Sequence, residues 1–233
     1  MKQQGLYIPS KNYSFFKVLS FIAFSIVVFF GLKEGIHGLR YFAEYPEEKK
    51  LTALLLLPHI GLGFIAILLG PLQFWKQLRT KYLHFHRWLG RIYISSVAIS
   101  ASIGLYMGIT HHNLVFSTGT TGLAIAWLIT VTMAFITIRK KLVQEHKEWM
   151  IRNYVVTFGF VSYRIGRQIM DTMDFEDTVI MAWLCWVPQL LITELLIQLS
   201  HSQLFNNKGK SDLRPKLNLT KEAFIYTKQE ISS

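Results

Sequence analysis

Residues 52–75 read TALLLLPHIGLGFIAILLGPLQFW, an apolar run that contains no charged side chain. About 20 helical residues of this kind cross a hydrocarbon core of about 30 Å. The run must be helical in lipid, because a single strand would leave its backbone groups without hydrogen-bond partners. This stretch therefore predicts a transmembrane helix and decides the fold class.

Five further apolar stretches have a similar length, at 14–32, 88–109, 119–138, 150–170 and 178–200. The chain has 233 residues, of which 51% are hydrophobic and 17% charged, and this composition does not describe a water-soluble surface. We expect an all-α polytopic membrane protein whose six-helix domain covers residues 1–200, with its core at 52–170. Residues 201–233 then form a basic, flexible cytoplasmic tail.

The distribution of basic residues predicts the orientation. Eighteen Lys and Arg residues fall in the amino-terminal stretch, the second and fourth connections and the tail, against four in the first connection and none in the third or fifth. The positive-inside rule then places both termini in the cytoplasm and the chain in the inner membrane, as a multi-pass protein. The net charge of +11 does not indicate nucleic acid as a partner, since the basic residues lie between apolar segments.

Two polar residues are predicted to lie at one depth in the outer half of the membrane. Arg164 lies about 21 Å from the cytoplasmic start of its helix, and His59 lies about 12 Å below the outer boundary. An Arg in hydrocarbon is costly, so Arg164 must face protein, water or an anionic ligand. We expect His59, as a neutral imidazole, and Arg164 to form one pocket for a quinone or a similar small molecule. The alternative for His59 is a hydrogen bond between helices.

A second group of histidines precedes the third and fifth spans on the cytoplasmic side. His84 and His86 come just before Trp88, and His146 comes just before Trp149. Two imidazoles at one depth could ligate a b-type haem, with His86 and His146 as axial ligands. Alternatively, the three histidines could bind Zn²⁺ or another transition metal, or act only as interface anchors. The predicted partners of haem propionates or other anions are Arg87, Arg91 and Arg152.

Four motifs carry a resemblance to a known family: PHIG at 58–61, GPLQF at 70–74, HRWLGRIY at 86–93 and HKEWMIR at 146–152. Together they resemble the bacterial predicted membrane proteins grouped as domain of unknown function 2306, over residues 52–200. The resemblance marks these positions: His59, His86, Arg87, Gly90, Arg91, His146, Trp149, Met150, Arg152 and Arg164.

The chain is also more weakly similar to the cytochrome b561 and ferric reductase type of transmembrane haem protein. That resemblance implies six helices, cytoplasmic termini and paired histidines on four central helices. His86 and His146 fit one such pair. The second pair is missing, because the span at 119–138 has no histidine to match His59.

Two functional hypotheses follow from these residues. The first is a membrane-embedded redox or cofactor-binding protein that acts in electron transfer, with a b-type haem as cofactor. The second is a non-enzymatic transporter, sensor or assembly factor in which the His and Arg clusters are structural. The chain has no nucleotide-binding fingerprint, so neither a catalytic group nor a reaction is assigned.

Overall fold

The computed structural model describes Phe29, residues 50–174 and residues 178–202. The span predicted at 14–32, apart from Phe29, and the tail after residue 202 lie outside these residues. The chain divides into two compact units, Met1–Leu190 and Leu191–Ser233.

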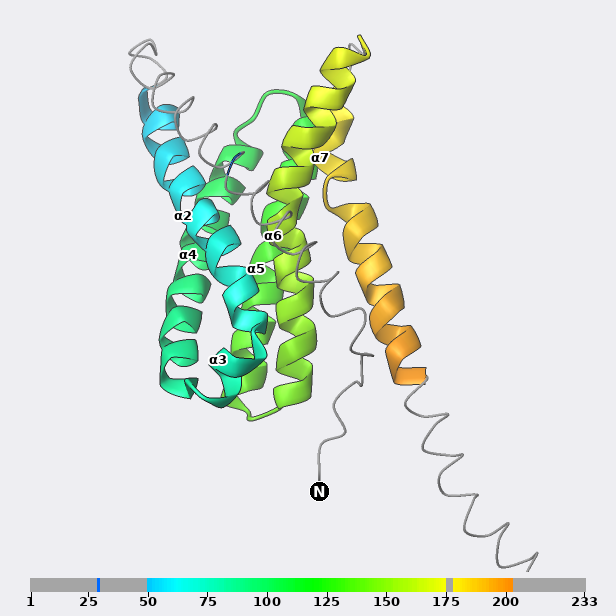
Figure 1. The fold of residues 1–233 in the computed structure, drawn as a ribbon. Coiled ribbons are helices and arrows are strands. Elements are labelled where there is room, and N and C mark those ends of the chain that lie inside the picture. Colours follow the sequence, from blue (N-terminus) through cyan, green and yellow to red (C-terminus); the bar gives the residue numbers. More distant parts are fainter. Residues whose placement is uncertain (1–28, 30–49, 175–177, 203–233) are drawn as a thin grey trace, which may run out of the picture. The chain divides into compact units, whose positions relative to one another are not determined.

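Four long helices build the first unit: α2 (Lys50–Phe74), α4 (Leu83–Ile109), α5 (Leu114–Arg139) and α6 (Val143–Thr172) (Figure 1). α4 packs against α2 and α5, and α5 also packs against α6. The described residues contain helices and turns but no strand, which confirms the predicted all-α class.

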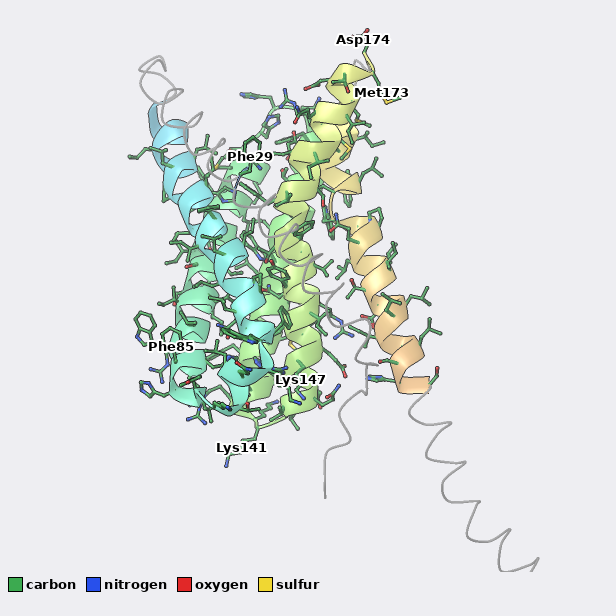
Figure 2. The ribbon with its side chains drawn as sticks, viewed as in Figure 1. Phe29, Phe85, Lys141, Lys147, Met173 and Asp174 are labelled. Atoms are coloured by element: carbon green, nitrogen blue, oxygen red, sulfur yellow. The ribbon has the colours of Figure 1, made fainter. Side chains whose placement is uncertain are left out.

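The two ends of this bundle need names. The short helix α3 (Lys76–Thr80) joins α2 to α4 at what we call the α3 end. Residues 110–113 join α4 to α5 at the opposite end, which we call the 110–113 end. Phe85 and Lys141 lie at the α3 end and Met173 lies at the opposite end (Figure 2).

Several helices are suited to a bilayer. Four described segments are long and apolar enough to cross a membrane: Leu54–Phe74, Leu83–Ile109, Leu114–Arg139 and Met181–Ser202. α6 is 30 residues long but is not among the four, because polar side chains recur along its length. The count of six spans and the cytoplasmic termini therefore stay predictions.

The segment predicted as one span at 178–200 is interrupted. It begins as the 3₁₀ turn η2 (Thr178–Ile180) and the short helix α7 (Met181–Leu184), and a turn at 185–186 precedes a helix over 187–202. Pro188 accounts for the break, because it has no N–H to donate to the carbonyl of Leu184. The turn thus lies two residues before Pro188.

A proline also shapes the contact between α2 and α6. Pro71 cannot donate to the carbonyl of Ile67 four residues earlier. The hydroxyl of Tyr154 on α6 donates to that carbonyl instead, over 3.3 Å. The Tyr154 ring lies directly over Gly70, where any side chain would overlap it. In the GPLQF motif, Gly70 thus leaves room for the Tyr154 ring, and Pro71 leaves a carbonyl that the Tyr154 hydroxyl can bind.

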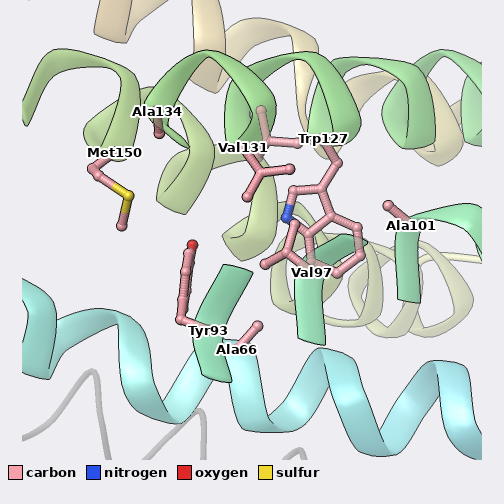
Figure 3. Packing of buried hydrophobic residues seen from close by; sticks show 9 residues of the cluster. Ala66, Tyr93, Val97, Ala101, Trp127, Val131, Ala134 and Met150 are labelled. Atoms are coloured by element: carbon pink, nitrogen blue, oxygen red, sulfur yellow. The ribbon is translucent and has the colours of Figure 1, made fainter. Parts of the chain in front are cut away.

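The core contains polar groups as well as apolar ones. Tyr93, Val97, Trp127 and Val131 pack together between α4 and α5 (Figure 3). The buried Tyr93 hydroxyl donates to Oδ1 of Asn153 on α6 at 2.6 Å. Membrane helices have little hydrophobic drive to associate once they are in lipid, so such bonds fix which faces meet.

Asn153 continues this hydrogen-bonded core towards α5. Its Nδ2 donates to Oγ1 of Thr130 at 2.9 Å and to the carbonyl of Trp127 at 3.2 Å. The Trp127 indole N–H donates to Oγ1 of Thr157 at 2.7 Å. One amide and one hydroxyl of α6 therefore hold α4 and α5 in register.

Candidate functional site

A cavity of about 640 Å³ lies towards the 110–113 end of the bundle. Its walls come from α2, α4, α5 and α6, with Ala182 of α7 and Cys185 as further lining residues, and its lining is mainly apolar. His59 and Arg164 both line it, and the charge of Arg164 is close enough to act on the imidazole. The structure thus brings the two residues of the predicted outer pocket to one cavity.

His59 is held in place by α4. Its Nδ1 lies 2.8 Å from the carbonyl of Ser100, and Oγ of Ser100 donates to the carbonyl of His59 at 2.8 Å. A carbonyl only accepts, so Nδ1 carries the proton of the neutral ring and Nε2 has the lone pair. The predicted alternative, a hydrogen bond between helices, is therefore present, and it also sets the tautomer offered to a ligand.

Gly104 makes room for this imidazole. An added Cβ at Gly104 would lie 2.8 Å from Cε1 of His59, closer than real Cβ contacts come. The two glycines that follow His59 in the sequence do not have this role. Gly61 faces open space, and an added Cβ at Gly63 would make only an ordinary contact of 3.6 Å with Ser100. The glycine that makes room for the His59 ring therefore lies on α4 and not on α2.

Arg164 is steadied by its own helix. Its guanidinium carbon lies 3.7 Å from the centroid of the Phe160 ring, and Nη1 donates to the Phe160 carbonyl at 3.2 Å. Stacking on an aromatic face stabilises a cation where water is scarce. Arg167, three residues on, is exposed and lies 3.8 Å from Oδ2 of Asp171. The contact with Asp171 one turn later accounts for Arg167 without a ligand.

Further cavity residues carry polar groups that the sequence did not single out. Tyr163, Trp127 and His111 are among those that line the cavity. His111 is exposed, and its ring also packs on Phe116 with centroids 4.3 Å apart. Tyr163 could have been found from its position next to Arg164 in the sequence. Trp127 lies in an apolar run, and nothing in that run marks it as a cavity residue.

The predicted haem ligands lie at the α3 end. His86 lies in the first turn of α4 and His146 in the first turn of α6, at the same end of the bundle. Nδ1 of His146 bonds to the carbonyl of Ala134 at 2.8 Å. Burial lowers the pKa of His146, which precedes the predicted span 150–170, while this hydrogen bond raises it. Neither ring lines the cavity that holds His59.

The other predicted ligands at this end are less enclosed. His84, Arg87 and Arg91 are exposed, and Arg152 stacks over the Trp149 ring at 4.8 Å. Among the described residues, no group of three or more His, Cys, Asp or Glu side chains could hold a metal ion. The structure therefore places His84, His86 and His146 at one end of the bundle without a three-residue metal site among the described residues.

Comparison with known proteins gives one match. Residues 56–197 match the family model described as "Predicted membrane protein (DUF2306)". No curated protein and no solved structure matches the chain.

Proposed function

The chain belongs to the DUF2306 family of predicted membrane proteins, and we propose that this multi-pass protein binds a small, largely apolar molecule that carries hydrogen-bonding oxygens, such as a quinone. The observation that carries this proposal is the 640 Å³ cavity shared by His59 and Arg164. Small-molecule sites are concave and mainly apolar, with a few placed polar groups, and this cavity has that character.

The polar groups suit the two oxidation states of a quinone. Arg164 is a cation beside the cavity, and a guanidinium donates to carbonyl or anionic oxygens. His59 carries its proton on Nδ1, so Nε2 accepts from the hydroxyl of a quinol. The apolar remainder of the lining suits the rest of such a ligand, which reaches the protein through the bilayer.

Equilibrium binding tests this proposal with a water-soluble short-chain benzoquinone and the detergent-solubilised full-length chain. Loss of a hydrogen bond to a charged group costs about 1.5–3 kcal/mol, so Arg164→Gln should weaken binding about tenfold to a hundredfold. Arg167→Gln is the matched control, because it removes the same charge from an exposed site on the same helix. Equal affinities for the two variants, or no binding by the natural chain, would refute the proposal.

A b-type haem at the α3 end is the second candidate. The observation that favours it is the bond from Nδ1 of His146 to a backbone carbonyl, which is how metal-bound imidazoles are commonly oriented. His146 and His86 would hold the haem, and a bound haem would supply one-electron chemistry. Reduced-minus-oxidised spectra of protein from haem-replete cells test this candidate. Bands of b type should vanish in His86→Ala and in His146→Ala, and a spectrum without such bands removes the candidate.

A further inference from the structure

Four polar side chains from four helices converge at the α3 end, away from the cavity described above. Gln73 is in the last turn of α2, Arg79 is in α3, His86 is in the first turn of α4 and His146 is in the first turn of α6. We call these four residues the α3-end cluster.

Two observations show that the members are neighbours. An added Cβ at Gly90, one turn after His86 on α4, would lie 3.4 Å from Oε1 of Gln73. His146, Arg79 and Arg87 lie close enough to His86 for a charge on any of them to act on its ring. The cluster therefore combines several nitrogen donors with the positive charge of Arg79.

Three nitrogen atoms of the cluster are buried without a hydrogen-bond partner in the described part of the chain: Nε2 of Gln73, Nε of Arg79 and Nδ1 of His86. The first two are donors, and Nδ1 of His86 is a donor when the ring carries its proton on that atom. Gln73 is only 5% exposed, so its amide cannot turn to bulk water. Buried polar groups in native proteins almost always have a hydrogen-bond partner, and even one without a partner needs an explanation. Here three such atoms lie at the same end of the bundle.

An oxyanion explains all three donors at once. Guanidinium, amide and imidazole N–H groups are the donors that bind phosphate, whose oxygens accept several bonds together. We propose that Gln73, Arg79 and His86 form a binding site for a phosphate group at the α3 end.

The surroundings place this site at the level of lipid headgroups. Trp75, Tyr82, Phe85 and Trp88 are all more than half exposed around it. Exposed aromatic residues of this kind mark the membrane interface. The phosphate belongs either to a phospholipid headgroup or to a free anion from the adjoining aqueous phase, and the chemistry of recognition is the same for both.

Two probes distinguish these sources with the full-length chain. Native mass spectrometry of protein solubilised with phosphatidylglycerol counts retained lipid. Thermal unfolding in about 10 mM inorganic phosphate reports binding of the free anion. The comparison is with chloride at equal ionic strength, so that charge screening is the same in both solutions.

Arg79→Gln is the main variant, and Lys76→Gln is its control, because Lys76 is exposed on the same short helix. Loss of the guanidinium should weaken binding about tenfold or more for whichever probe binds, while the control keeps the affinity of the natural chain. Circular dichroism checks that both variants remain helical.

Gln73→Leu separates a binding role from a packing role. It removes a buried donor with no protein partner, so it should weaken binding of the same probe several-fold and leave the unfolding temperature without ligand equal or higher. The proposal fails when neither probe binds the natural chain, or when Arg79→Gln and Lys76→Gln bind alike. It also fails when Gln73→Leu leaves binding unchanged, or when a b-type spectrum depends on His86. None of these outcomes bears on quinone binding, which concerns the other end of the bundle.

Discussion

Replacing Gly104 by alanine tests how tightly α4 positions the His59 imidazole. The added Cβ would lie 2.8 Å from Cε1 and 3.3 Å from Nδ1 of that ring. The ring cannot move away freely, because Nδ1 bonds to the Ser100 carbonyl at 2.8 Å and the Ser100 hydroxyl bonds back to His59. Either the two helices move apart or these bonds lengthen.

The expected magnitude follows from two opposing effects. Overpacking a well-packed contact costs about 1–3 kcal/mol. Alanine gains about 0.5–1 kcal/mol over glycine within a helix. The balance is a loss of about 0.5–2 kcal/mol, which lowers the unfolding temperature by about 1–8 °C for a chain of this size.

Gly61→Ala is the matched control, since its Cβ would meet nothing within 4 Å. The same helix gain then acts alone, so Gly61→Ala should leave the unfolding temperature unchanged or raise it by a few degrees. Thermal unfolding in one detergent, followed by tryptophan fluorescence, measures both variants. Shifts of the same sign and size in the two variants would refute the reasoning, as would benzoquinone binding that Gly104→Ala leaves at full strength.

Three further predictions concern topology, the core and the cavity. Reporter fusions test the orientation predicted from the basic residues. Fusions after Gly38, His112 and Asp174 should report the outside, and fusions after Arg79, Lys141 and Lys210 should report the inside. Opposite readings at two or more sites would overturn the predicted topology. Asn153→Leu should destabilise the protein by about 1–3 kcal/mol, because it leaves the buried Tyr93 hydroxyl without its acceptor. In a Tyr93→Phe background the same change should cost measurably less, and equal costs in the two backgrounds would show that the bond contributes nothing. Cysteines at positions 59 and 164, in a Cys185→Ser background, should be joined by a short cross-linking reagent and should resist membrane-impermeant thiol labels, whereas ready labelling from the aqueous phase would place them outside a common buried cavity.

Much of the helix arrangement could be predicted from hydrophobic length alone. The spans expected at 88–109 and 119–138 lie inside α4 and α5, because uninterrupted apolar runs leave no other choice in lipid. The boundaries were less accurate, since α4 begins at Leu83. Its first residues include His86, whose polarity hides the helix start from a hydropathy argument.

The cavity was predicted only through its two most polar residues. Depth along each helix placed His59 and Arg164 at one level, because helical rise is a fixed quantity. Trp127 and Tyr163 could not be assigned to the same cavity, since which face of α5 or α6 turns inwards depends on packing between helices. Gln73 could be quoted from a motif, but its burial beside Gly90 is a property of the folded bundle.

The hydrogen-bonded core closes the cavity on the side that faces the α3 end. Trp127 and Thr157 line it and are bonded to each other, and one turn beyond Thr157 the fully buried pair Asn153 and Tyr93 closes the way towards the α3 end. Passage from the cavity towards the α3 end would require a second conformation, in which the hydrogen bond between the Tyr93 hydroxyl and Asn153 of α6 is broken.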